Sequence, residues 1–183
     1  MSATPQLLDC AYYVAAECRS CRWLPRSYAD QLAAKQTAAA ELVAAPEEIW
    51  EEPVASRPDG FRNKAKMVVG GTSAAPSLGI LDPTGRGVDL RDCPLHEAPI
   101  VAALPVLADF VTRAALAPYQ VNSESPVQQR GELKYLLVTA SPDAELMVRM
   151  VVRSRATEAR IRKHLPGLLA ALPGLRVVTI QIR

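Results

Sequence analysis

The sequence predicts an α+β protein in which helices pack on one side of a mostly antiparallel sheet, with a small cysteine module at the N-terminus. Segments that alternate polar and apolar residues recur from residue 60 onward, and two helical segments lie between them. Three of the four cysteines lie within the first 21 residues. We therefore expect a module with a helix and a linker over residues 1–59, completed by Cys93, and a central α+β domain over residues 60–183.

The N-terminal module is expected to contain one helix. Residues 10–26 form a short, turn-like cysteine knuckle, and Ser27 is a suitable N-cap for a helix that runs to about Ala45. Pro46 ends it, and the prolines in residues 47–59 indicate a linker or an extended packing arm. Four apolar residues share one face of the predicted helix: Leu32, Ala39, Leu42 and Val43.

The central domain is expected to contain five strands and two helices. The strands are predicted over residues 61–69, 77–81, 131–140, 145–153 and 176–182. The helices are predicted over residues 96–116, interrupted near Pro105, and over residues 157–172, kinked at Pro166. Gly70 and Gly71 are expected to form a turn, and residues 82–87 a loop. On the first strand, one face is expected to carry the apolar set Phe61, Ala65, Met67 and Val69. On the strand over residues 145–153, one set is expected to face the core, Leu146, Val148, Met150 and Val152, and the other set points outward, Met147, Arg149, Val151 and Arg153.

The four cysteines form the most restrictive pattern in the sequence. Cys10, Cys18 and Cys21 are close together, Cys93 is distant, and the chain has no other thiol. Three close ligands and one distant ligand suit a [4Fe-4S] cubane, which takes one thiolate at each iron. Structural zinc sites usually offer two close pairs, whereas only Cys18 and Cys21 form one here. The spacing alone leaves iron–sulfur, zinc, and free or disulfide-bonded thiols open.

Composition and motifs limit the possible functions. No apolar run approaches the ~20 residues that span a bilayer, and the N-terminus lacks the features of a signal peptide, so we expect a cytoplasmic protein without membrane contact. No phosphate-binding glycine loop is present. His96 and His164 are isolated in the sequence and are expected at the surface or at helix ends. The sequence therefore offers no catalytic residue of its own.

Basic residues concentrate in the central domain. Residues 1–59 contain five Lys and Arg against nine Asp and Glu, so the excess of positive charge lies in residues 60–183. Such side chains on strand faces either keep the protein soluble or contact phosphates. Tyr12, Tyr13 and Trp23 could stack on unpaired bases or shield a metal from solvent. Seven basic residues are candidate RNA contacts: Arg62, Lys64, Lys66, Arg130, Lys134, Arg149 and Arg153.

Four motifs in this order resemble a known family. They are Cys10-x7-Cys18-Arg-Ser-Cys21-Arg-Trp, Gly60-Phe-Arg-Asn-Lys-Ala-Lys-Met67, Asp92-Cys93-Pro-Leu95 and Gln129-Arg-Gly-Glu-Leu-Lys-Tyr135. Together they resemble the RNA 5-methyluridine methyltransferases that modify 23S ribosomal RNA, in the short branch without an N-terminal β-barrel domain.

This resemblance implies both a cofactor and a partner. It assigns a structural [4Fe-4S] cluster to the four cysteines and a role in gripping 23S rRNA to the α+β domain. It further implies a Rossmann-like domain that binds S-adenosyl-methionine and supplies the catalytic cysteine and base. No cysteine follows Cys93 and no cofactor loop is present, so we expect the chain to contain only the N-terminal and central portions, as a monomer.

The chain alone is therefore expected to transfer no methyl group. All four thiols are assigned to the cluster, so none remains to attack a uracil. An assay with the purified chain, labelled methyl donor and unmodified 23S rRNA tests this, and incorporation of label would contradict it. A stand-alone metal-stapled RNA-binding module is the alternative function, and a zinc-stabilised module without RNA affinity is a third.

Overall fold

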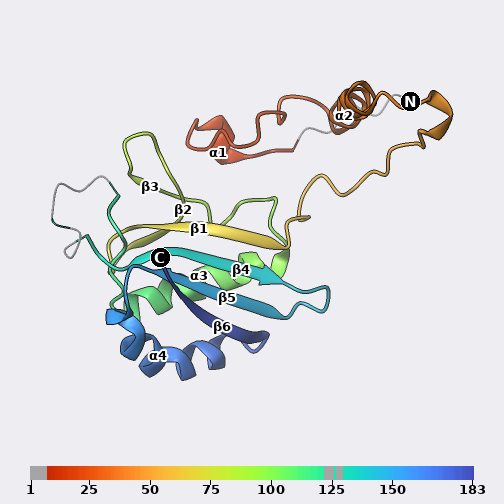
Figure 1. Cartoon of the computed structure of the whole chain (residues 1–183). Helices are drawn as coiled ribbons and strands as arrows, with labels where there is room; N and C mark the ends of the chain where they lie inside the picture. Colours follow the sequence, from red (N-terminus) through yellow and green to blue (C-terminus); the bar gives the residue numbers. More distant parts are fainter. Residues whose placement is uncertain (1–7, 122–125, 127–129) are drawn as a thin grey trace. The chain divides into compact units, whose positions relative to one another are not determined.

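The computed structural model describes residues 8–121, 126 and 130–183. The chain divides into two compact units, Met1–Phe61 and Arg62–Arg183 (Figure 1). The N-terminal residues used above to judge a signal peptide, and Gln129 at the start of one motif, lie outside the described residues. No helix in the described part of the chain is long and apolar enough to cross a membrane.

The first unit is built around one long helix. It contains α1 (Ala11–Val14), α2 (Tyr28–Val43) and the 3-10 turn η1 (Glu47–Ile49). The Ser27 hydroxyl accepts a hydrogen bond from the Asp30 amide at 3.1 Å, which confirms the predicted N-cap.

The segment after α2 is attached to the helix by hydrogen bonds. The Ser56 amide donates to the Tyr28 hydroxyl at 2.8 Å, and the Gln36 side chain donates to the Glu51 carbonyl at 3.2 Å. These bonds favour a packing arm over a free linker. The apolar face predicted for α2 forms no core, because no residue of this helix is buried and the Leu42 side chain is 86% exposed.

The second unit is a six-stranded sheet with helices on one face. The strands are β1 (Lys64–Gly71), β2 (Pro76–Leu81), β3 (Gly87–Asp89), β4 (Leu133–Ala140), β5 (Leu146–Val152) and β6 (Leu175–Ile182). The spatial order is β3-β2-β1-β4-β5-β6, and only β5 and β6 pair in parallel. The helices are α3 (Ala98–Arg113) and α4 (Glu158–Ala171), with the 3-10 turn η3 (Arg155–Thr157) before α4. The mixed sheet confirms the predicted α+β class.

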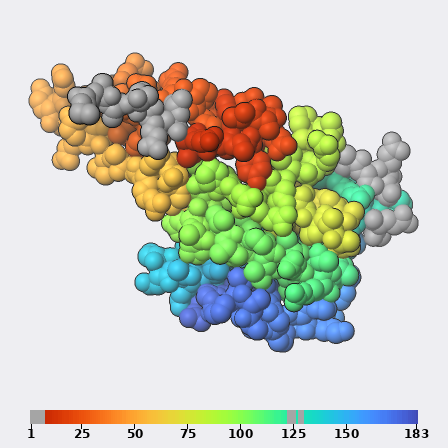
Figure 2. Space-filling view, turned by 180° about the vertical axis from the view of Figure 1, so that it is seen from behind, coloured from red at the N-terminus to blue at the C-terminus, as the bar shows by residue number. Residues whose placement is uncertain are grey.

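One side of this sheet forms the core of the protein. Met67 of β1, Leu136 of β4 and Met150 of β5 are at most 3% exposed and belong to one cluster with Leu104 of α3 and Ile161 of α4. The alternating strand pattern therefore buries one face beneath both helices. Figure 1 shows α3 behind the central strands, and the view from behind in Figure 2 shows α3 (green) and α4 (blue) over that side of the second unit.

Three details of the sequence prediction are wrong. Phe61 does not enter the core, since β1 begins only at Lys64 and the Phe61 side chain is 47% exposed. Gly70 and Gly71 are the last two residues of β1 and do not form the turn. The turn lies between Thr72 and Ala75, where the Thr72 amide donates to the Ala75 carbonyl. Helix α3 continues through Pro105 instead of being interrupted there. Pro105 is exposed, so the proline ring needs no space in the core, and the backbone carbonyl that proline leaves without a donor can face solvent.

A short strand was missed where a loop was predicted. β3 begins at Gly87, and a Cβ atom added to Gly70 would come within 2.8 Å of the Gly87 Cα. Only glycines permit this close approach of two backbones. The sequence signal was therefore the Gly85-Arg-Gly87 segment, whose glycines indicated a turn without showing which strands it brings together.

Candidate functional site

Local hydrogen bonds fix the backbone around the three cysteines of the first unit. Cys10 is the residue before α1, and its carbonyl accepts from the Tyr13 amide at 3.0 Å. The Cys18 amide donates to the Tyr12 carbonyl at 3.1 Å. The Cys21 carbonyl accepts from the Leu24 amide at 2.9 Å, which closes a turn. Each cysteine therefore occupies a defined position within a short segment of turns.

The donor chemistry of the cysteines fits an iron–sulfur cluster. All four thiols are partly buried and none forms a disulfide. Cys93 lies in the second unit, where its amide donates to the Leu90 carbonyl at 3.2 Å and its carbonyl accepts from the His96 amide at 3.2 Å. Within the described residues, no three His, Cys, Asp or Glu side chains are gathered as a metal site. The [4Fe-4S] assignment therefore stays a prediction.

Cations surround two aromatic rings of the first unit. The Arg19 guanidinium lies 4.2 Å from the Tyr13 ring centroid. Sequence reasoning considered these rings as shields or stacking partners but did not include the cations among the RNA contacts. The sequence signal for these contacts was that the cations lie close to Trp23 along the chain. The three cations around the Trp23 ring are Arg22 at 5.8 Å, Arg26 at 5.3 Å and Lys35 at 5.7 Å.

The structure brings three of the seven candidate RNA contacts together on one surface. We call this surface the open face: the side of β1, β4, β5 and β6 that points away from α3 and α4. Lys66 lies opposite Leu137, which lies opposite Arg149, and Lys64 lies in the neighbouring row. Among the described residues, neither Lys64 nor Arg149 has an ion pair or a hydrogen-bond partner for its side chain. These cations are therefore available to an anionic ligand.

Three other candidates lie apart from this group. Arg62 is exposed, and its backbone pairs with the segment before α3. The Arg62 carbonyl accepts a hydrogen bond from the Glu97 amide at 3.0 Å. The Lys134 ammonium donates to the Arg183 carbonyl at 2.8 Å and lies 4.5 Å from the Tyr119 ring centroid. Arg130 is partly buried at the start of the segment leading to β4.

Arg153 is engaged inside the protein. Its guanidinium pairs with the Glu132 carboxylate, and the two side chains are only 22% and 10% exposed. Glu132 also accepts from the Ser154 amide at 2.9 Å and from the Ser154 hydroxyl at 2.8 Å. The sequence prediction that Arg153 points outward overlooked this partner, which lies 21 positions earlier.

The two histidines occupy different environments. His96 directly precedes Glu97, the N-cap of α3, as the helix-end expectation allowed; it is buried at 9% exposure, and its Nδ1 has no partner among the described residues. Burial lowers the pKa of His96, and the positive charge of Arg62 lowers it further. His164 lines a pocket between α3 and α4, and no described acid–base pair includes either histidine. Asp109 lines the same pocket as His164, and the expectation that neither histidine is a general base stays a prediction.

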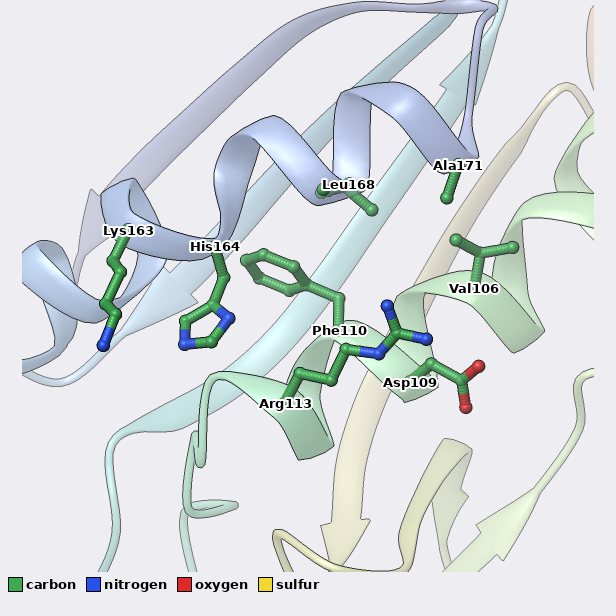
Figure 3. A pocket seen from close by; sticks show the side chains of 9 residues that line it. Val106, Asp109, Phe110, Arg113, Lys163, His164, Leu168 and Ala171 are labelled. Carbon is green, nitrogen blue, oxygen red and sulfur yellow. The ribbon is translucent and has the colours of Figure 1, made fainter.

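The pocket between α3 and α4 lies on the helical layer of the second unit (Figure 3). It measures about 260 Å³, and Phe110 contributes to its apolar wall. Arg113 and Lys163 also line it, without an ion pair to any described residue. These two cations carry the same charge as those of the open face but lie in a different layer, which makes them a matched control for tests of that face.

Comparison with known proteins gives close relatives. The chain is 47% identical over 178 residues to the 23S rRNA (uracil(747)-C(5))-methyltransferase RlmC of Cronobacter sakazakii and 44% identical to that of Escherichia coli. Each match covers 96% of this chain and 46% of the relative. No family model matches. The solved tRNA (uracil-54, C5)-methyltransferase of Pyrococcus abyssi, in complex with S-adenosyl-L-homocysteine, has a similar fold at 18% identity and TM-score 0.57, covering 78% of this chain and 34% of that one.

Over nearly its whole length the chain is therefore similar to members of the family of RNA uracil-C5 methyltransferases. Within that family, the curated relatives are 23S rRNA enzymes of the uracil(747)-C5 type, and the chain spans about half of their length.

Proposed function

We propose that this chain forms the iron–sulfur and RNA-recognition part of an S-adenosyl-methionine-dependent methyltransferase that makes 5-methyluridine in 23S rRNA. The single observation behind this proposal is the 44–47% identity to 23S rRNA uracil-C5 methyltransferases over 96% of the chain. Methyl transfer is proposed for the complete enzyme, because this chain covers 46% of those relatives. We also infer that the protein is a cytoplasmic monomer, with residues 1–59 and 60–183 as its two functional parts.

The four cysteines are proposed to hold a [4Fe-4S] cluster. Cys10, Cys18 and Cys21 would supply three thiolates, and Cys93 would supply the fourth. None of the four cysteines is bound in a disulfide, which is compatible with this assignment. When bound, the cluster would act as a structural link between the two parts of the chain, and it would supply no thiolate for attack on a uracil.

The open face is proposed to carry the phosphate contacts with the RNA. Lys64, Lys66 and Arg149 are the candidates that the fold supports best, because no carboxylate of the described residues forms an ion pair with them. Arg62, Lys134 and Arg130 are proposed as peripheral contacts. Arg153 ranks last because its charge is already paired with Glu132.

Salt-dependent RNA binding tests this function. For the double variant Lys64→Gln/Arg149→Gln, we expect the slope of log affinity against log salt to become shallower by about 1.4, since each lost contact with a single strand removes about 0.7. The measurement is filter binding of the purified chain to a transcript of the 23S rRNA region that the relatives modify, at several salt concentrations.

The double variant Arg113→Gln/Lys163→Gln is the control for this experiment. It removes the same charge from the helical pocket and should leave the slope unchanged if the open face carries the contacts. Equal effects of the two double variants would show that only net charge matters. Absence of RNA binding by the unaltered chain would contradict the proposed function itself.

A further inference from the structure

The open face has an apolar centre in addition to its cations. Leu137 lies between Lys66 and Arg149, and Met147 lies in the row of Lys64. Both apolar side chains are only partly buried, although they sit in the middle of a six-stranded sheet. Neither helix of the second unit covers them, because α3 and α4 pack on the opposite face. The surface is therefore flat, partly apolar and available to a ligand.

Tyr135 is the one aromatic residue that the strand register assigns to this described surface. It lies opposite Val68 of β1 and Val151 of β5, on the same side as Leu137 two residues later. The Lys66 ammonium lies 4.6 Å from the centroid of its ring. This cation–π contact places the ammonium over one face of the ring, so a positive charge and an aromatic side chain are presented together and the opposite face is the one left for stacking.

The charge of the open face favours an anionic partner. The residues that β1, β4, β5 and β6 direct to this side include three cations and no carboxylate. Cations alone would serve any polyanion, including duplex nucleic acid. A partly buried ring among apolar side chains adds something that a duplex cannot use, because paired bases are stacked within the helix and leave no face free. An unpaired base can stack on such a ring.

We propose that the open face binds unpaired nucleotides, with Tyr135 as the ring on which a base stacks and Lys64, Lys66 and Arg149 as the contacts to the flanking phosphates. This inference rests on the proposed RNA partner and adds selectivity for single strands. Tyr135 was not among the site residues predicted from the sequence. Its role follows from the pairing of β4 with β1 and β5, which places it beside Lys66.

Substitution of Tyr135 tests the stacking. The probe is a fluorescein-labelled single-stranded RNA of roughly 12 nucleotides, a length that a single-strand-binding surface of this size accommodates, compared with the same strand in a duplex. Tyr135→Leu keeps an apolar side chain in the sheet but removes the ring, and we expect affinity for the single strand to fall about tenfold. Affinity for the duplex should change little. Tyr135→Phe keeps the ring and should bind the single strand as the unaltered chain does.

Thermal unfolding of each variant identifies any loss caused by misfolding, and Tyr135→Phe provides a second folded reference. Unchanged single-strand binding by Tyr135→Leu would overturn the stacking proposal, as would an equal loss for single strand and duplex. A preference of the unaltered chain for the duplex would overturn it as well. In all three cases RNA still binds, so the proposed function survives. No binding of either RNA would contradict the proposed function instead.

Discussion

Cys21→Ser is expected to abolish the cluster and with it the folded state of the first unit. A [4Fe-4S] cluster holds about four irons, so iron and sulfide per chain should fall from about four to near zero. The structural consequence should be large because the described part of the first unit has almost no core: Ser27 is its single buried residue. A segment without a core depends on its metal site for stability.

The experiment is anaerobic purification followed by iron, sulfide and zinc analysis and limited proteolysis. Ser20→Ala is the matched control, since Ser20 lies between Cys18 and Cys21 and only accepts a long hydrogen bond, at 3.5 Å, from the Cys18 thiol. The control should retain its iron and its resistance to protease. Stoichiometric zinc without iron in the unaltered chain would replace the iron–sulfur assignment by a zinc site.

Glu132→Ala is expected to lower the free energy of unfolding of the second unit by about 3 kcal/mol. The substitution leaves the Arg153 guanidinium charged and only 22% exposed, and it removes the carboxylate oxygen that accepts from both the amide and the hydroxyl of Ser154. An uncompensated charge at this depth is costly, because the guanidinium then keeps only the Gly131 carbonyl, which accepts from its Nε at 3.3 Å, as a described hydrogen-bond partner. Urea denaturation followed by circular dichroism gives the measurement.

The pair of Glu145 and Arg176 provides the comparison within the same sheet. These side chains are 50% and 59% exposed, so Glu145→Ala should cost less than about 1 kcal/mol. An equally small effect of Glu132→Ala would mean that Arg153 is free to leave its partner. Arg153 would then return to the group of RNA contacts, and Arg153→Gln should reduce the salt dependence of RNA binding.

Local sequence signals predicted the secondary structure well where the chemistry was itself local. Ser27 caps α2 as expected because the cap involves only residues three positions apart. The alternation in β1 and β5 correctly predicted one buried set of side chains on each strand, but Val151, which was assigned to the outward set of β5, is also buried. Predictions were wrong where the deciding partner was distant. The place of Phe61 depends on where β1 begins to pair with β4, and β3 depends on the approach of Gly87 to Gly70.

The candidate sites divide in the same way. The sequence by itself determined the resemblance to a family, the four-cysteine pattern and the set of basic residues, because these are properties of order and spacing along the chain. Only the tertiary structure decided which basic residues act together. Strand pairing gathers Lys64, Lys66 and Arg149 on the open face and adds Tyr135, whereas a carboxylate 21 positions away engages Arg153. The alternation of residues along a strand shows only which face of that strand a side chain occupies. The pairing register between strands determines which residues lie next to a charged side chain, and hence what that side chain can bind.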